Sequence, residues 1–122
     1  HDLPVARQHL KFAPGTTLVF DRGYWSARYL EWLDENSIAF VTRARKNNRF
    51  EVVQTLEPSS DCRVISDEQV QQRSRRNYKN CQIPLRRVTY FDIETERELV
   101  FITNRFDLAA TTIAALYKAR WQ

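Results

Sequence analysis

The pattern of apolar and polar positions predicts a strand, a helix and a second strand in the first part of the chain. Leu18–Phe20 is a continuous apolar run, which is typical of a strand buried on both faces of a parallel sheet. A stripe with helical spacing follows, Asn36 is able to end it, and Ile38–Thr42 is a second apolar run. In such a unit the two strands run parallel and are joined by a right-handed crossover. The residues of the helical stripe are Trp25, Tyr29, Leu30 and Leu33.

Two charged residues follow the predicted strands directly. Asp21 comes after the first strand, just before the turn-forming Gly23, and Arg43 comes after the second strand. The carboxyl ends of neighbouring parallel strands meet at one edge of the sheet, where the ligands of open α/β sheets gather. A carboxylate and a guanidinium at this edge indicate a site for a metal ion and a phosphate. A purely structural interpretation, in which Asp21 is a turn or helix-cap residue, fits the residues equally well.

From Phe50 to Thr103 the pattern changes to short β-like segments separated by turns. Phe50–Val53 alternates weakly, and Cys62–Ile65 is a second short segment. Val88–Phe91 faces Leu99–Ile102 across a polar turn, which predicts a hairpin. This region is therefore expected to be rich in β structure.

A stretch without acidic residues lies inside this region, between Gln69 and Phe91. One-sided charge of this kind, interleaved with Tyr78, favours contact with a nucleic-acid backbone. An exposed face of a sheet explains it equally well. The basic run Arg43–Arg49 allows the same two interpretations, a phosphate contact or a solvated loop. The basic residues of the acid-free stretch are Arg73, Arg75, Arg76, Lys79, Arg86 and Arg87.

Helical spacing returns in the last part of the chain, where Asp107 is a reasonable N-cap for a helix that continues through Ile113 and Trp121. At about 100° per residue, Tyr117 and Arg120 lie on one face of this helix. By itself such a pair indicates packing and a surface charge more often than a site.

The composition favours an anionic partner and argues against a disulfide-rich, a cysteine-ligated metal-binding or a membrane-spanning protein. The 122 residues carry a formal net charge of +4, and the pI is about 9.3, which favours an anionic partner. Cys62 and Cys81 have neither metal-ligand spacing nor the number needed for a disulfide framework, and His1 and His9 are best explained as packing or solvated residues. No apolar stretch approaches the roughly 20 residues that span a bilayer, so we expect a cytoplasmic protein. The chain contains no methionine, and we expect it to be a piece of a longer protein.

Three segments in this order together resemble the catalytic domain of IS4-type DDE transposases, over nearly the whole chain. They are Asp21–Tyr24 after a buried strand, Phe40–Arg43 in the next strand, and Thr103–Phe106 leading into Ile113–Gln122. The resemblance implies an α/β fold, namely part of a ribonuclease-H-like fold with a β-rich insertion. It also implies three parts: residues 1–49 as the first part of the core, 50–103 as the insertion, and 104–122 as the returning core helix.

The resemblance further implies metal-dependent DNA chemistry. In this family two aspartates and a glutamate hold divalent metal ions, with Mg²⁺ as the expected ion, and Asp21 matches the second aspartate. Tyr117 and Arg120 match the first two members of the family's Tyr-Arg-Glu-Lys signature. The first aspartate would precede His1, and the glutamate and lysine would follow Gln122. We therefore expect the parent protein to cleave and join DNA and this chain alone to be inactive.

The expected partners are the DNA of the transposon ends and of the target, and a second copy of the parent protein in a homodimer. An alternative is a basic α/β module that binds nucleic acid without chemistry. The residues expected to contact DNA are Arg43, Arg45, Lys46, Tyr117 and Arg120.

Overall fold

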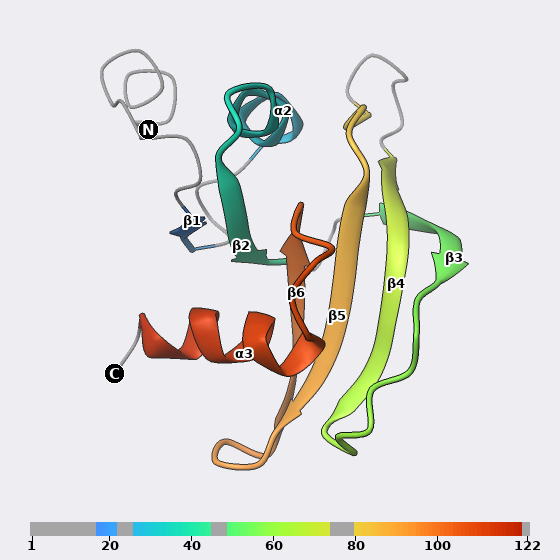
Figure 1. Cartoon of the computed structure of the whole chain (residues 1–122), viewed down its shortest axis with the longest axis vertical. Helices are drawn as coiled ribbons and strands as arrows, with labels where there is room; N and C mark the ends of the chain where they lie inside the picture. The colour runs from blue at the N-terminus through green and yellow to red at the C-terminus, as the bar shows by residue number, and fades with distance from the viewer. Residues whose placement is uncertain (1–16, 22–25, 45–48, 74–79, 121–122) are drawn as a thin grey trace.

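A single mixed sheet forms the centre of the structure, a computed structural model that describes residues 17–21, 26–44, 49–73 and 80–120. Its six strands lie in the order β1-β2-β6-β5-β4-β3 (Figure 1). The predicted α/β class is confirmed. In chain order the elements are β1 (Thr17–Val19), α2 (Ala27–Glu35), β2 (Ala39–Arg43), β3 (Arg49–Thr55), β4 (Val64–Arg73), β5 (Leu85–Asp92), β6 (Arg97–Thr103) and α3 (Ala110–Ala119).

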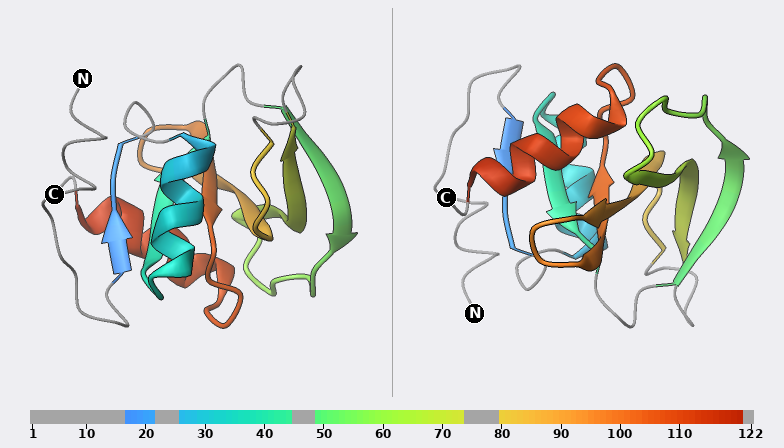
Figure 2. Two further views of the ribbon diagram at one scale, coloured as in Figure 1. Left: turned by 90° about the horizontal axis from the view of Figure 1, so that it is seen from above. Right: turned by 90° about the horizontal axis from the view of Figure 1, so that it is seen from below.

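The two helices of the described chain cover opposite faces of the sheet (Figure 2). Successive strand residues point to opposite faces, and the core is accordingly divided into two clusters. On β2, Phe40 packs with α2 and Val41 packs with α3. On β6, Phe101 belongs to the α3 cluster and Ile102 to the α2 cluster. These four residues are buried, which explains why their strands read as continuous apolar runs.

The predicted pairing of the first two strands is confirmed. β1 and β2 run parallel, with Thr17 opposite Ala39 and Val19 opposite Val41. Tyr29, Leu30 and Leu33 of the predicted helical stripe lie in α2, and Leu30 is fully buried against the sheet. Trp25 lies outside the described residues. The strand-helix-strand unit therefore forms as the apolar pattern predicts.

The end of α2 delivers the chain into β2. Asn36 is the C-cap, as predicted, and Ser37 adopts a left-handed conformation with φ of 60°. The Ile38 N–H then donates to the Leu33 carbonyl at 2.9 Å, and the Ser37 N–H donates to the Asp34 carbonyl at 3.0 Å. This pair of bonds is the Schellman arrangement, which satisfies carbonyl groups at the helix end and reverses the chain.

The remaining strands are antiparallel, and the predicted hairpin is confirmed. β5 pairs with β6 so that Tyr90 lies opposite Leu99 and Asp92 opposite Arg97. β6 also pairs with β2, which makes the sheet continuous from β1 to β3. The division of the chain at residues 50 and 104 stays a prediction, and strands from both sides of the first boundary are hydrogen-bonded neighbours.

One strand was predicted too short. Of the expected segment Cys62–Ile65, only Val64 and Ile65 lie in β4, which begins at Val64 and continues to Arg73. The segment Ser66–Arg73 is mostly polar, so no apolar alternation marks it. It forms a strand because β3 and β5 pair with its two edges, while Val70 provides its contact with the core.

The acid-free stretch does not form one continuous basic surface, so that part of the prediction is wrong. Arg86 is only 4% exposed and binds Asp67, so it is not available to a DNA backbone. Carboxylates on the neighbouring strand also neutralise Arg73 and Arg87 of the stretch. The acidic partners that the stretch itself lacks come from adjacent strands: Glu51 pairs with Arg73, and Glu68 pairs with Arg87. Arg75, Arg76, Tyr78 and Lys79 lie outside the described residues.

The predicted cap of the last helix is also wrong. α3 begins at Ala110, its N-cap is Ala109, and no side chain caps it. The Asp107 carboxylate instead accepts hydrogen bonds from Arg105 at 2.6 and 3.0 Å. This ion pair lowers the pKa of Asp107 below its usual value. A carboxylate engaged two residues before the N-cap cannot also reach the amides of the first helical turn.

Arg86 fixes the approach to α3. Its guanidinium binds both carboxylate oxygens of Asp67, at 2.8 and 2.6 Å. Its remaining nitrogen donates to the carbonyls of Leu108 at 2.6 Å and Arg105 at 3.2 Å. The buried charge is thus satisfied by a neighbouring strand and by the segment that leads into the helix.

Replacing Arg86 should therefore destabilise the fold strongly. Arg86→Met leaves the buried Asp67 without its partner, and removing one partner of a buried pair costs about 3–5 kcal/mol. The exposed pair of Arg73 and Glu51 is a matched control, for which Arg73→Met should cost only about 0–1 kcal/mol. The free energy of unfolding in urea, followed by circular dichroism, measures both. Equal losses in the two variants would contradict this assignment.

Candidate functional site

Asp21 and Arg43 lie side by side at the carboxyl ends of β1 and β2, and Arg43 is the last residue of its strand. Val19 and Val41 are paired in the register of β1 and β2. The Phe20 N–H donates to the Val41 carbonyl at 3.2 Å, and the Thr42 hydroxyl donates to the Phe20 carbonyl at 2.9 Å. The register therefore continues for one residue beyond β1. Asp21 and Arg43 are the next residues, directly after Phe20 and Thr42 in the two adjacent segments.

Both residues belong on the face of the sheet that α3 covers. Leu18 and Phe20 pack in the α2 cluster, whereas Val19 packs in the α3 cluster. In extended chain, residues two apart share a face, so Asp21 is on the same face as Val19. Arg43 is two residues after Val41, which packs under α3. Arg43 lines a cavity together with residues of α3, and continued alternation predicts the same side of the sheet for Asp21.

The last helix brings Tyr117 and Arg120 to this edge. The Tyr117 ring is 6% exposed and packs on Phe101, with ring centroids 5.2 Å apart. The Arg120 Nε donates to the Val19 carbonyl at 2.7 Å. Asp21 is two residues further along the chain, and two extended residues span at most about 7 Å. Of the other predicted DNA contacts, Arg45 and Lys46 lie outside the described residues.

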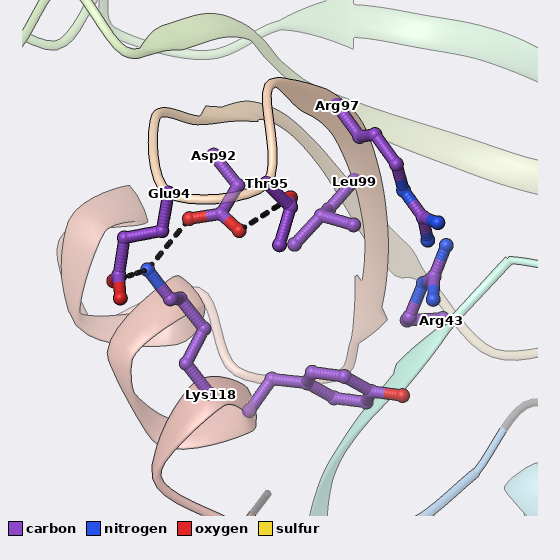
Figure 3. A pocket seen from close by; sticks show the side chains of 8 residues that line it. Arg43, Asp92, Glu94, Thr95, Arg97, Leu99 and Lys118 are labelled. Carbon is purple, nitrogen blue, oxygen red and sulfur yellow. Dashed lines mark hydrogen bonds and ion pairs between the residues drawn. The ribbon is translucent and has the colours of Figure 1, made fainter. Parts of the chain in front are cut away.

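A cavity of about 270 Å³ lies between the end of β2, the β5–β6 hairpin and α3. Figure 3 shows the side chains that surround it. Two of its lining residues, Arg43 and Tyr117, are among the predicted site residues. The others are Asp92, Glu94, Thr95, Arg97, Leu99 and Lys118. The structure thus brings Arg43 and Tyr117 together on one cavity, while Arg120 reaches the neighbouring strand β1.

Lys118 joins the two sides of this cavity, α3 and the β5–β6 hairpin. Its ammonium donates to Asp92 at 2.7 Å and to Glu94 at 3.0 Å, and the Thr95 hydroxyl donates to Asp92 at 2.7 Å (Figure 3). The bonds from Lys118 and then Thr95 lower the pKa of Asp92, and the bonds to Asp92 and then Glu94 raise the pKa of Lys118. The hairpin is therefore held against α3 by charge-assisted hydrogen bonds.

Sequence reasoning missed this network. The sequence pattern places Asp92 and Glu94 only in a hairpin and its polar turn, and Lys118 only in the helix beside Tyr117. An acidic turn and a lysine near the end of a helix are weak signals separately. Their pairing becomes visible only when the helix is packed across the hairpin.

A model of the family described as "Transposase DDE domain" matches residues 1–122. This chain belongs to that family. It is also 34% identical over 112 residues to "Putative transposase y4zB" of Sinorhizobium fredii (strain NBRC 101917 / NGR234). That alignment covers 88% of this chain and 31% of the relative, so the chain spans about a third of the length of the curated relative. No solved structure gives a significant match to the chain.

The resemblance to DDE transposases is thus confirmed at the level of the family. The mixed sheet with a helix on each face is consistent with part of a ribonuclease-H-like DDE domain. DDE domains of transposases generally use divalent metal ions. Within the described ranges, no group of three or more His, Cys, Asp or Glu side chains is placed to hold a metal ion. Asp21 could supply one ligand, but the described carboxylates do not form a metal-binding cage by themselves.

The two described helices of this DDE domain are α2 and α3. In the part of the chain that the structure describes, neither is long and apolar enough to cross a membrane.

The Lys118 network should make stability depend on pH at both ends of the scale. Asp92 titrates below its ordinary value of 3.8, so its contribution is present above pH 3.8 and is lost as the pH falls through the lower folded pKa. Lys118 titrates above its ordinary value of 10.5, so its contribution is present below pH 10.5 and is lost as the pH rises through the higher folded pKa.

The variant Lys118→Met should abolish the alkaline part of this dependence and weaken the acid part. Urea unfolding at a series of pH values measures the difference from the unsubstituted chain. Arg105→Met is a control, because it removes a different ion pair, with Asp107, and keeps the alkaline loss of Lys118. If Lys118→Met and the unsubstituted chain lose stability in parallel above pH 10.5, the network does not hold the hairpin to the helix.

Proposed function

We propose that this DDE domain is part of an IS4-type transposase, whose whole protein cleaves DNA strands and transfers transposon ends to a target in a metal-dependent reaction. The observation that carries the proposal is the position of Asp21. It follows a half-buried parallel strand, lies level with Arg43, and is close in the chain to the carbonyl that binds Arg120. The family match over residues 1–122 supports the same conclusion.

Asp21 is proposed to be the catalytic carboxylate of this chain and a metal ligand. Magnesium, an ion that prefers oxygen ligands, suits an aspartate. Paired ions of this kind stabilise the attacking and leaving oxygens of an in-line phosphoryl displacement. A single aspartate does not hold two such ions, so the other ligands would come from residues outside the described part of the chain.

The basic residues at the same edge are proposed to bind the DNA backbone. Arg43 and Arg120 present planar guanidinium groups, which bind phosphate oxygens through two parallel hydrogen bonds. Arg45 and Lys46 follow β2 in the sequence after Ala44 and would extend this surface. Tyr117 lines the cavity beside Arg43, where its hydroxyl could donate to a phosphate. The net charge of +4 favours the same partner.

The biological setting follows from the proposed reaction. The substrates would be the DNA of the transposon ends and of the target, in the cytoplasm of a prokaryotic cell. We also propose that the whole protein acts as a homodimer, because the reaction joins two transposon ends to one target.

The decisive variant is Asp21→Asn in the full-length protein. It should abolish nicking of supercoiled plasmid in the presence of Mg²⁺, because an amide cannot replace a carboxylate in binding the metal. DNA binding measured without metal should not weaken. Asp61→Asn is a matched control in the turn before β4, and it should keep nicking activity. The 122-residue chain alone should not nick plasmid under the same conditions. Retained nicking by full-length Asp21→Asn would show that Asp21 is not catalytic.

A further inference from the structure

We propose that Arg43 and Arg97 form a two-arginine site that holds one phosphate of a DNA strand at the edge of the cavity. We call these two residues the arginine pair. Figure 3 shows their guanidinium groups pointing toward one another, one from the end of β2 and one from the start of β6. The inference rests on the proposed DNA-processing function and adds a binding residue, Arg97, that neither the motifs nor the sequence spacing indicates.

The backbone explains why these distant residues meet. Arg43 is opposite Phe101 in the pairing of β2 with β6, and the Ala44 N–H donates to the Val100 carbonyl at 2.9 Å. Arg97 shares a face with Leu99 and Phe101, because the three are spaced two residues apart on β6. That face packs under α3. Arg43 therefore reaches along Leu99 toward Arg97.

The carboxylates that line the cavity are engaged at one end of it. Lys118, at one end, is matched by Asp92 and Glu94. Asp92 lies directly opposite Arg97 in the hairpin, but its oxygens accept hydrogen bonds from Lys118 and Thr95. Within the described ranges, Arg97 consequently has no ion pair. The other end of the cavity presents two guanidinium groups, and guanidinium stays protonated at any ordinary pH.

Two neighbouring guanidinium groups repel each other unless an anion lies between them. A phosphodiester is the anion that suits this position, because two planar forks can each bind its oxygens. Tyr117 lines the same cavity and can add a hydroxyl donor. Arg43 also lies level with Asp21, so a phosphate on the arginine pair would belong to the same strand that reaches Asp21. Lys118 acts as a positioning residue, since it holds the hairpin that carries Arg97.

The test is fluorescence anisotropy of a labelled DNA duplex with the 122-residue chain across a range of salt concentrations. Removing one contact between a basic side chain and a phosphate lowers the slope of log affinity against log salt by about 0.9. Arg97→Gln should weaken binding to the duplex, and combined with Arg43→Gln it should lower the slope by that amount, because the shared phosphate then loses both of its contacts. Arg28→Gln is the matched control: it makes the same charge change on α2, at the opposite face of the sheet, and should leave the slope unchanged.

A double-mutant cycle tests whether the two arginines share one phosphate. If they do, either single variant keeps one arginine on that phosphate and should lower the slope by less than about 0.9, whereas Arg43→Gln combined with Arg97→Gln should lower it by about 0.9. A decrease of about 1.8 would mean two separate phosphates and would overturn the shared site. Arg97→Lys should keep the slope and lower the affinity, because lysine retains the charge but not the fork. An affinity of Arg97→Gln equal to that of the unsubstituted chain at every salt concentration would overturn the proposal outright.

A second measurement separates this proposal from the proposed function. Pyrophosphate is titrated into the chain while the Nε–H signals of arginine are followed by nuclear magnetic resonance. Coupled shifts of the Arg43 and Arg97 signals support the phosphate site even if the chain does not bind the duplex, in which case the DNA-binding function fails instead. Duplex binding that depends on Arg43, with no response of the Arg97 signal to pyrophosphate, overturns the arginine pair and leaves the proposed function standing.

Discussion

The buried guanidinium of Arg86 is the constraint on which the geometry of this domain depends. A charge that is 4% exposed must find partners for its donors, and Asp67 alone does not use them all. The remaining donors reach the carbonyls of Arg105 and Leu108, which directly precede the helix α3. The start of α3 is thereby tied to the centre of the sheet. A helix without a side-chain cap obtains its position from this contact instead.

Once its start is fixed, α3 reaches β1 at its other end. Two side chains secure that end: Lys118 binds the β5–β6 hairpin, and Arg120 binds the Val19 carbonyl. Both cations lie in or next to the last turn, where the partial negative charge of the helix C-terminus favours them. The helix therefore crosses the sheet from β4 and β5 to β1. This crossing brings the Tyr117 and Arg120 face of the helix to the strands that end at Asp21 and Arg43.

The parts of the fold that the sequence predicts are those in which local pattern and packing agree. Leu18–Phe20 and Ile38–Thr42 are apolar because both faces of their strands are covered, and their pairing follows from the helix between them. The hairpin is predicted for a similar reason, since its strands are close in sequence and carry aromatic and β-branched residues. For the candidate site, Arg43 and Tyr117 line one cavity, as expected from the end of the second strand and from the helical spacing of the last segment. The roles of Asp21 and its partners stay predictions.

The parts that could not be predicted depend on partners far away in the sequence. β4 is polar, and only Arg86 and Arg87 on β5 explain why Asp67 and Glu68 can lie in a central strand. The same pairs explain why a stretch without acidic residues is not a free basic surface. The sequence of one strand gives only the charges of that strand. Pairing with the neighbouring strands decides which of these charges are exposed to solvent. Asp107 is a further case, because its neighbour Arg105 competes successfully with the helix amides.

Side-chain hydrogen bonds between the end of β6 and β2 join the hairpin to the strands that carry the candidate site. The Thr103 hydroxyl donates to the Phe40 carbonyl at 2.6 Å, and the Asn104 side chain accepts from the Phe40 N–H and donates to the Ile38 carbonyl. These bonds join the end of β6 to β2 in addition to their ladder. The hairpin is therefore hydrogen-bonded into the same sheet as β1 and β2. Arg97 on β6 and Asp21 after β1 are joined through β2, so one continuous sheet sets their separation. If both residues act as proposed, the arginines and the carboxylate are already positioned for one DNA strand before the reaction, because strands of the same sheet carry them.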